Sequence, residues 1–588
     1  MPTIIINGKT CEFTPGQKIL EVANEAEIEI PQYCYHPGLS IPAQCRICLA
    51  EIWAPNPRND NKLEPMMGGK LLPTCSTDAA EGMVVYADAP NAVANQKAVM
   101  EYLLINHPLD CPVCDQAGEC SLQDYSYKYG RSASRFEETK VKQPKKNLGP
   151  EVYIYSDRCI MCTRCVRFAQ EVPGTSELMI DGRGNMSQID IFPGQALDNE
   201  LAGNVIDLCP VGALLDKDFL FTQRVWFLKK TPSIDGLTAS GDNISIEHNQ
   251  GKVYRFKPRT NMAINKWWIT DEVRYGWKFI HSENRLTEPQ RRQHGVLSES
   301  PWQRAIEQAI DGLKAASIDA GKRLGLVVSP MLSCEDAYLL AKLAKAIDPE
   351  AVLALGPVPI AGEDKTFPPG ADETDLNFFK LYAEKAPNAR GVRRVLEAFG
   401  PVSDFNDWLG QVNNGPIGAT VVTGNYPSNW VTDDIAKAIQ KTHLVLLDTL
   451  HSPLVDCADV VVPAATWAEK AGTFENARNM IQAFEQAIPV VGRSKAEAQF
   501  ALDALAVMAG TDLQRPSATY EDLIVDEGPG QVPSATSSVA LPRTTLYNAA
   551  TVRTQMAETH DALACFSTEV ATPTVERESH TDMPLVQL

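Results

Sequence analysis

The stretch Arg158-Cys159-Ile160-Met161-Cys162-Thr163-Arg164-Cys165 carries the strongest signal in this chain. It holds three cysteines at two-residue intervals, and Cys209-Pro210 follows after a long gap. A C-x2-C turn directs two thiolates to one centre, while backbone N–H groups point at the sulfurs. Three thiolates so spaced wrap one face of a cubane, and Cys209 closes it. We call these four cysteines the triplet set and predict that they bind a [4Fe–4S] cluster.

The triplet set resembles the cysteine run of bacterial ferredoxins, with one departure. No fourth cysteine follows shortly after Cys165, so the segment offers ligands for one cluster and not for an interleaved pair. The alternative is a structural zinc site, which also uses four cysteines. Zinc sites usually pair two C-x2-C turns, so the spacing favours iron and sulfide.

Cysteine is concentrated near the N-terminus of the chain. Of 15 cysteines, only Cys334, Cys457 and Cys565 lie beyond residue 210. In a reducing compartment such density indicates metal binding, not disulfides. A second group, the histidine set, comprises His107, Cys111, Cys114 and Cys120. A lone histidine is more often a satisfied polar residue than a ligand, and the spacing alone leaves both interpretations open.

A third group, the loop set, comprises Cys34, Cys45, Cys48 and Cys75. Plant-type [2Fe–2S] ferredoxins use C-x4-C-x2-C and a remote fourth cysteine. The loop set fits that logic with a longer first gap, and zinc is again the alternative.

The N-terminal segment fits the same interpretation. Residues 3–13 predict a hairpin whose turn is Asn7-Gly8, a type I′ signal. Residues 17–26 predict a short amphipathic helix, and this is how a β-grasp ferredoxin domain opens. Cys11 falls in the second hairpin strand and is predicted to pack in the core.

Together these motifs resemble the large iron–sulfur subunit of respiratory complex I, the G-type or 75 kDa-type subunit of NADH:quinone oxidoreductase. The resemblance is strong over the first ~220 residues, a span of two to three modules. It covers all three sets, including His107-Pro108-Leu109-Asp110-Cys111-Pro112-Val113-Cys114, Gly118-Glu119-Cys120 and Asp207-Leu208-Cys209-Pro210. Ala43, Ala117 and Ser121 depart from the usual residues of the family, and none of them is a ligand.

The resemblance implies a ligand assignment. It makes His107 a ligand of a [4Fe–4S] cluster, together with Cys111, Cys114 and Cys120. The triplet set then holds a second [4Fe–4S] cluster, and the loop set holds one [2Fe–2S] cluster. Three clusters need twelve ligands, which eleven cysteines and His107 supply. Cys11 and the three late cysteines have no C-x2-C neighbour and stay outside the assignment.

Residues 226–282 resemble the opening module of molybdopterin oxidoreductases. In those enzymes the module carries cysteines for a further [4Fe–4S] cluster. Here Asp235, Thr238 and Asp242 stand where three of those cysteines would be. The resemblance therefore implies a module that has lost its cluster.

From about residue 300, apolar runs alternate with helical patterns. Strands are predicted at 323–328, 419–423 and 443–447, with helices at 334–347 and 432–442. This βαβ rhythm implies an open parallel sheet. Residues 415–418 contain two glycines but precede a strand, so they predict a turn and not a phosphate-binding loop.

Residues 458–476 also resemble molybdopterin oxidoreductases. No convincing Cys or Ser ligand for molybdenum precedes them, and Cys334 and Cys457 are single cysteines in packing contexts. We therefore expect a molybdopterin-oxidoreductase-like domain that serves as a scaffold and binds no molybdopterin.

Two charged segments complete the chain. Residues 511–588 carry eleven acidic and four basic side chains and predict an acidic, extended or partner-dependent tail. The stretch from Lys128 to Lys146 is basic. It is either a solvated linker or a surface that docks against acidic subunits or offsets cluster charge.

The expected fold class is multidomain, α+β followed by α/β. The expected parts are a β-grasp [2Fe–2S] domain, the histidine-set module, a [4Fe–4S] ferredoxin-like module, the opening module, the molybdopterin-oxidoreductase-like α/β domain and the tail. Their expected boundaries are residues 1–82, 83–148, 149–225, 226–282, 283–510 and 511–588.

Composition limits the location and the partners. The formal net charge of -20 argues against broad nucleic-acid binding. No apolar run approaches the ~18 residues that a membrane span requires, and the first residues show no signal peptide. We expect a cytoplasmic protein, peripheral on the inner membrane through its complex.

The resemblance implies electron transfer and no independent catalytic site. Electrons would arrive from an FMN- and NADH-binding subunit and a small [2Fe–2S] subunit. They would leave from the triplet set toward the quinone-side subunits of a proton-pumping complex. The alternatives are an iron–sulfur diaphorase subunit of an NAD-linked hydrogenase or formate dehydrogenase, a catalytic molybdenum enzyme, and a zinc-bound scaffold.

Overall fold

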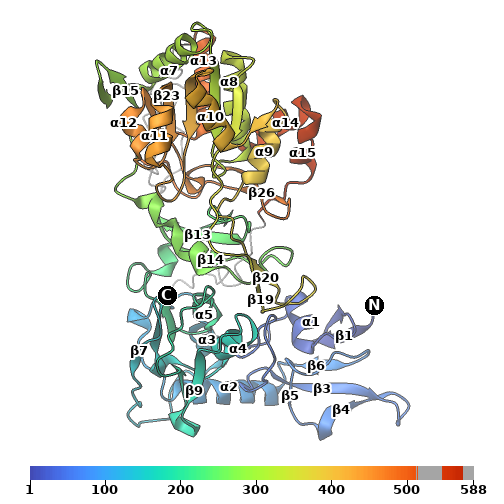
Figure 1. Cartoon of the computed structure of the whole chain (residues 1–588). Helices are drawn as coiled ribbons and strands as arrows, with labels where there is room; N and C mark the ends of the chain where they lie inside the picture. Colours follow the sequence, from blue (N-terminus) through green and yellow to red (C-terminus); the bar gives the residue numbers. More distant parts are fainter. Residues whose placement is uncertain (512, 514–545, 574–588) are drawn as a thin grey trace, which may run out of the picture. The chain divides into compact units, whose positions relative to one another are not determined.

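The computed structural model describes residues 1–511, 513 and 546–573 of the chain (Figure 1). These residues form two compact units. The first comprises residues 1–228 and 366–379, and the second comprises the other described residues from 229 onward. No helix in the described ranges is both long and apolar enough to cross a bilayer.

The first unit opens with a mixed sheet of the β-grasp kind, with strand order β2-β1-β6-β3-β4 and β5 paired to β3. The predicted hairpin is present: Ile6 pairs with Lys9, and Asn7 and Gly8 both have positive φ, as a type I′ turn requires. Helix α1 (Ile19–Glu25) buries Leu20 and its apolar neighbours in the core of the sheet. The strands are β1 (Thr3–Ile6), β2 (Lys9–Glu12), β3 (Leu49–Asn56), β4 (Lys62–Pro65), β5 (Leu72–Pro73) and β6 (Val84–Tyr86).

The rest of the first unit is built from short elements between the cysteine motifs. One three-stranded sheet has the order β11-β8-β7, and β9 and β10 form a separate hairpin. The elements are α2 (Pro90–Leu104), α3 (Ser121–Tyr129), β7 (Lys145–Asn147), β8 (Val152–Tyr155), α4 (Arg164–Glu171), β9 (Leu178–Asp181), β10 (Gln188–Ile191), α5 (Asn204–Leu208) and β11 (Leu214–Asp216).

The second unit begins with an antiparallel sheet of the order β12-β13-β14. Strands β12 and β13 flank the loop that contains Asp235, Thr238 and Asp242. Behind this sheet lies a core with Trp277 and Trp467. The elements are β12 (Lys229–Ile234), β13 (Asn243–Asn249), β14 (Lys252–Pro258) and α6 (Asp271–Tyr275), followed by the hairpin strands β15 (Gln290–Gln293) and β16 (Val296–Glu299).

The main sheet of this unit confirms the predicted α/β class. Its order is β16-β15-β24-β23-β22-β17-β18-β21, and the six strands from β24 to β21 run parallel. Its elements are α7 (Trp302–Ala316), β17 (Arg323–Val328), α8 (Cys334–Ile347), β18 (Val352–Leu355), α9 (Ala389–Glu397), β21 (Val402–Ser403), α10 (Phe405–Asn414), β22 (Ile417–Thr423), α11 (Asp433–Ile439), β23 (His443–Asp448), α12 (Pro453–Cys457), β24 (Val460–Pro463) and α13 (Glu497–Met508).

The predicted turn at 415–418 is confirmed. Gly415 has a φ of 91° at the C-terminus of α10, and β22 starts two residues later. Two smaller two-stranded sheets complete the described fold. They are β19 (Lys365–Phe367) with β20 (Phe379–Leu381), and β25 (Gly472–Glu475) with β26 (Ile481–Phe484).

The expectation of an extended tail is wrong for residues 546–573. Helix α14 (Ala549–Thr559) buries Val552 and Met556 in the main core, and α15 (Cys565–Thr568) adds Phe566. Ala571 then bridges to Gln482 at the edge of β26. The low charge and apolar spacing of this short segment suffice for packing, which the average composition of the whole tail concealed. The rest of the predicted tail lies outside the described residues.

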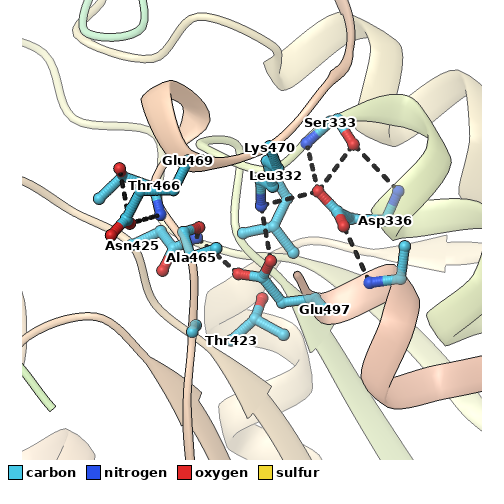
Figure 2. Close-up of polar contacts among 12 residues, drawn as sticks. Leu332, Ser333, Asp336, Thr423, Asn425, Ala465, Thr466, Glu469, Lys470 and Glu497 are labelled. Carbon is cyan, nitrogen blue, oxygen red and sulfur yellow. Dashed lines mark hydrogen bonds and ion pairs between the residues drawn. The ribbon is translucent and has the colours of Figure 1, made fainter. Parts of the chain in front are cut away.

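A buried ion-pair network stands near the carboxyl ends of β17 and β22, where the strand order reverses (Figure 2). Lys470 Nζ contacts Asp336 Oδ2 at 2.8 Å and Glu497 Oε2 at 2.5 Å, and all three side chains are buried. Asn425, just beyond β22, donates to the other oxygen of Glu497. Ser333 and Asp336 form the capping box of α8.

The contribution of this network to the free energy of unfolding depends on pH. Burial raises the pKa of Glu497 to about 7, although Lys470 opposes the rise. Burial also acts to lower the pKa of Lys470, but the two carboxylates hold it above its usual value. The folded chain therefore binds the Glu497 proton more tightly than the unfolded chain does. Stability contributed by this group is lost as the pH rises from about 4.5 to about 7.

Lys470→Met removes the cation and leaves two buried carboxylates together. Breaking a buried pair in this way costs about 3–5 kcal/mol of unfolding free energy. We expect the loss to be larger at pH 8 than at pH 5, where protonation relieves the repulsion. Urea unfolding followed by tryptophan fluorescence measures it, with exposed Lys437→Met as the matched control. A loss equal at both pH values would contradict the assigned role of Glu497.

Candidate iron–sulfur sites

The triplet set lines one small cavity. Cys159, Cys162, Cys165 and Cys209 all face it, and most of the other lining residues are apolar, among them Ile154, Ile189 and Leu214. Cys162 lies in the turn that leads into α4, Cys165 lies in the first turn of α4, and Cys209 follows the end of α5. The fold thus brings together two sequence motifs that are more than forty residues apart.

The surroundings of the triplet set suit a cluster better than bare thiols. Burial raises the pKa of Cys159 to about 12 and that of Cys209 to about 11. The backbone N–H of Met161 nevertheless donates to Cys159 Sγ at 3.3 Å. Met161 and Thr163 have positive φ, which turns the chain between the cysteines. Donors aimed at sulfur in an apolar pocket are the environment in which iron-bound thiolate is stable.

The loop set is also brought together, in two pairs. Cys34 Sγ donates to Cys45 Sγ at 3.4 Å, and Cys75 hydrogen-bonds to Cys48. The bond from Cys34 lowers the pKa of Cys45 to about 5, and the bond from Cys75 lowers that of Cys48. Within each pair one thiol therefore holds its proton less tightly than usual, which favours the thiolate form that metal ligation requires.

The loop that carries Cys45 adopts an unusual backbone. Ala43 has a φ of 50° and Arg46 a φ of 59°. This left-handed region favours glycine, the residue that the resemblance led us to expect near position 43. The departure noted in the sequence is therefore accommodated by strain and not by a different loop.

The histidine set lies between α2 and α3. His107 follows α2, Cys111 opens a short turn, and Cys120 precedes α3. Cys114 and Cys120 are buried, whereas Cys111 is exposed. Gly212 packs so closely on this site that a Cβ there would lie 2.3 Å from Cys114 Sγ.

The protonation state of His107 is compatible with ligation. Burial, and next to it the charge of Arg158, lowers its pKa to about 4. The imidazole is therefore neutral at pH 7 and keeps a lone pair for a metal. Burial raises the pKa of Cys120 to about 12. These features fit a [4Fe–4S] cluster. The side chains of the four residues of the set are not all connected by direct contacts.

Two side chains join the loop set to the triplet set. Arg167 donates to the carbonyl oxygens of Cys34 and Cys162, at 2.5 Å and 3.5 Å. Gln44 donates to the carbonyl oxygen of Met161 at 2.8 Å. The charge of Cys45 also contributes to the raised pKa of Cys162.

The triplet set and the histidine set adjoin as well. Cys120 Sγ contacts the carbonyl oxygen of Pro210 at 3.9 Å, and the charge of Cys209 acts on the pKa of Cys120. The triplet set therefore contacts both other sets. The sequence analysis did not predict these contacts of Arg167 and Gln44. The only sequence signal was that both residues lie close to candidate cysteine ligands.

Within the described ranges, no three His, Cys, Asp or Glu side chains converge on a point as they would around a single ion. Ligands of a multi-iron cluster bind different iron atoms and need not converge so tightly. The three sets are assigned from motifs, shared pockets and contacts.

Hydrogen bonds hold the β12–β13 loop. This is the segment in which the sequence resemblance implied that a cluster has been lost. Asp235 accepts from the backbone N–H groups of Leu237 and Thr238, at 2.8 Å and 3.0 Å, and from the hydroxyls of Thr238 and Ser240. Burial raises the pKa of Asp235 to about 6. Residues 228–278 contain no cysteine, so they do not fit a cluster.

The cysteines left outside the assignment lie in packing environments. Cys11 belongs to the β-grasp core, as predicted. Cys334 is fully buried at the start of α8 and contacts Asn388. Cys457 and Cys565 are partly buried against apolar clusters.

The basic stretch is largely engaged within the first unit. Lys128 pairs with Glu29, and Arg131 and Arg135 pair with Glu101. Other contacts are those of Lys140 with the carbonyl oxygens at the end of α2, of Lys145 with the Tyr155 ring and of Lys146 with Asp190. The sequence analysis considered a solvated linker, or a surface that docks against acidic subunits or offsets cluster charge. It did not consider ion pairs and contacts within the unit, which engage most of the positive charge of this stretch.

Fold and sites together define an iron–sulfur protein that carries a molybdopterin-oxidoreductase-type domain. Five family models match the chain. They are a 2Fe-2S iron-sulfur cluster binding domain (residues 1–90), the NADH-ubiquinone oxidoreductase-G iron-sulfur binding region (96–135), the NADH-quinone oxidoreductase subunit 3 ferredoxin-like domain (149–215), the NADH-ubiquinone oxidoreductase NDSU1/NuoG-like 4Fe-4S domain (228–278) and molybdopterin oxidoreductase (365–501).

Curated relatives carry the name that the motifs suggested. The chain is 36% identical over 347 residues to the G-type subunit of the NADH-quinone oxidoreductase of Rickettsia prowazekii (strain Madrid E), which is 59% of this chain and 49% of that protein. It is also 36% identical to the G-type subunit of Rickettsia felis (strain ATCC VR-1525 / URRWXCal2), over 58% of this chain and 48% of that protein. The chain thus matches about half the length of these relatives.

One solved structure is also similar. It is the crystal structure of an NAD+-reducing [NiFe]-hydrogenase in the H2-reduced state, 28% identical, and the match covers 38% of this chain and 91% of that chain. The TM-score is 0.33, which is too low to support an argument about fold or function.

Ala43→Gly tests the strained loop that presents Cys45. Glycine relieves the left-handed strain of about 1–2 kcal/mol but loses more entropy on folding, so we expect a net gain of up to about 1 kcal/mol. Urea titration of the loop-set visible absorption measures it. Ala54→Gly in strand β3 is the matched control and should lose stability. A loss at Ala43 as large as at Ala54 would show that the loop is not strained.

Proposed function

We propose that this chain conducts electrons in an NADH:quinone oxidoreductase, as part of a proton-pumping complex, and has no catalytic site of its own. The adjacency of the triplet set to both other sets carries this proposal. The 36% identity to proteins named as the G-type subunit of NADH-quinone oxidoreductase supports it. In that role the partners are an FMN- and NADH-binding subunit, a small [2Fe–2S] subunit and quinone-side subunits. The chain would then lie in the cytoplasm against the inner membrane, held there by its complex.

Twelve side chains would hold three clusters. The loop set would bind one [2Fe–2S] cluster, and the histidine and triplet sets would bind one [4Fe–4S] cluster each. When bound, such clusters supply one-electron carriers whose potentials follow ligand charge, hydrogen bonds to sulfur and burial. The chain itself orients the sulfurs, excludes water from the triplet set and places the three sets in contact.

The contacts favour a different electron order from the one expected from the sequence. We expected electrons to leave from the triplet set. The triplet set, however, contacts the loop set through Arg167 and Gln44, and the histidine set through Cys120. We therefore propose that it is the middle relay. Cys111 of the histidine set is exposed, which suits an exit to a partner.

We further propose that the α/β domain binds no molybdopterin. Ligands of open α/β sheets bind outside the carboxyl ends of the strands, where the strand order reverses. Near that position Lys470, Asp336 and Glu497 satisfy one another (Figure 2). Cys334 is buried against Asn388 and is not presented to a crevice. We propose the domain boundaries expected above as far as residue 510, with residues 546–573 added to the α/β domain because they pack in its core.

Metal content tests the assignment directly. Anaerobically purified full chain should contain about ten iron atoms and a matching amount of acid-labile sulfide, as one two-iron and two four-iron centres require. It should contain no molybdenum and should be brown. Inductively coupled plasma analysis and sulfide titration measure this. Colourless protein with stoichiometric zinc would refute the proposal, and stoichiometric molybdenum would refute its cofactor-free domain.

His107→Cys tests the one nitrogen ligand. A thiolate in place of neutral imidazole makes the site one unit more negative, so reduction becomes harder and the midpoint potential falls. EPR-monitored redox titration should show a retained cluster at a lower potential. The exposed His451→Cys serves as the control and should change nothing. An unchanged EPR and redox profile would count against ligation by His107.

A further inference from the structure

Arg158 is a buried cation that reaches from one cysteine set into the next. It immediately precedes Cys159 of the triplet set, and it is only 2% exposed. Its guanidinium nevertheless extends to the histidine set. Nη1 donates to Cys114 Sγ at 3.5 Å and to the carbonyl oxygen of Gly212 at 3.4 Å. A charged donor thus touches a sulfur that the proposed assignment makes a cluster ligand.

The guanidinium is fixed on its other edge. Nε and Nη2 both donate to Asp110 Oδ2, at 3.1 Å and 2.8 Å. The face of the guanidinium stacks on the Tyr155 ring, 4.1 Å from its centroid. These contacts hold the side chain in one orientation, with its positive edge toward Cys114 and its negative partner on the far side.

This geometry has a defined electrostatic consequence. An arginine remains protonated in proteins, so the charge near Cys114 is permanent. Reduction of an iron–sulfur cluster adds one negative charge to the cluster and its sulfurs. A buried cation that donates to a ligand sulfur stabilises the reduced form, because low-polarity surroundings screen it weakly. The carboxylate of Asp110 carries the opposite charge and opposes this effect; of the two side chains, only that of Arg158 hydrogen-bonds to Cys114.

We propose that Arg158 raises the reduction potential of the histidine-set cluster selectively, with Asp110 as a weaker counterweight. The inference rests on the proposed function and deepens it, because it names a residue that sets the driving force between neighbouring relays. Arg158 is a positioning and tuning residue and not a ligand. The triplet set has a different cation, since Arg164 acts on the pKa of Cys162. The effect of Arg158 should therefore be confined to one cluster.

Variants of the full chain test the proposal by EPR-monitored redox titration. Arg158→Met removes the near cation and should lower the histidine-set potential most. Asp110→Asn removes the opposing charge and should raise it above that of the parent. The double variant removes both charges and should fall between Arg158→Met and the parent. We expect Arg158→Met to weaken one-electron reduction about tenfold, a shift of ~59 mV.

The other clusters supply the internal control. The loop-set and triplet-set potentials should move much less than the histidine-set potential in every variant. Equal shifts in all three clusters would indicate a general structural change and would overturn the proposal. So would a histidine-set potential that does not move, or one that moves in the same direction in Arg158→Met and Asp110→Asn.

Assembly failure does not leave the proposal untested. If Arg158→Met loses the cluster, Asp110→Asn decides alone: a raised potential supports the proposal and an unchanged one overturns it. Arg158→Lys keeps the positive charge but loses the forked hydrogen-bonding geometry of the guanidinium. Its histidine-set potential should shift less than that of Arg158→Met wherever both variants assemble the cluster. If the unmodified chain yields no histidine-set signal, the ligand assignment fails and this inference fails with it. Normal signals with an unresponsive potential refute Arg158 tuning alone.

Discussion

The structure of the first unit depends on the cost of placing thiolate sulfur in an apolar interior. Burial raises the pKa values of Cys159, Cys165 and Cys209, so these side chains resist ionisation as free thiols. Iron coordination would remove that cost under the proposed assignment, because a metal takes the charge that the pocket cannot solvate. The local backbone also stabilises charge on sulfur. Met161 adopts a left-handed conformation and donates its N–H to Cys159 Sγ.

Two buried arginine side chains lie between cysteine sets whose negative charges would otherwise repel one another. Under the proposed assignment, three anionic centres in one small unit would need compensating charge between them. Arg167 bridges the loop and triplet sets through carbonyl oxygens, and Arg158 bridges the triplet and histidine sets through Cys114. Both are buried, so solvent screens their charges less than it would at the surface. The same contacts that fix the distances between relays therefore also bear on their potentials.

The second unit satisfies buried polar groups from within. In the β12–β13 loop the carboxylate of Asp235 accepts hydrogen bonds from backbone N–H groups and a hydroxyl. The parallel sheet keeps its strand order, while Lys470 and two carboxylates occupy the position near its carboxyl ends. In both places internal polar contacts satisfy groups that would otherwise be buried without partners.

The sequence by itself determined the classes of structure and the candidate ligands. The Asn7-Gly8 hairpin, the strand at 323–328 and the helix at 334–347 depend on local turn chemistry and periodicity, which a linear pattern records. The ligand roles, read from motif spacing, stay predictions. Only the tertiary structure decided that the triplet set has two neighbours, that Arg158 reaches Cys114, and that α14 packs on the main core. These contacts join residues tens to hundreds of positions apart, and no local periodicity encodes which distant side chains will meet.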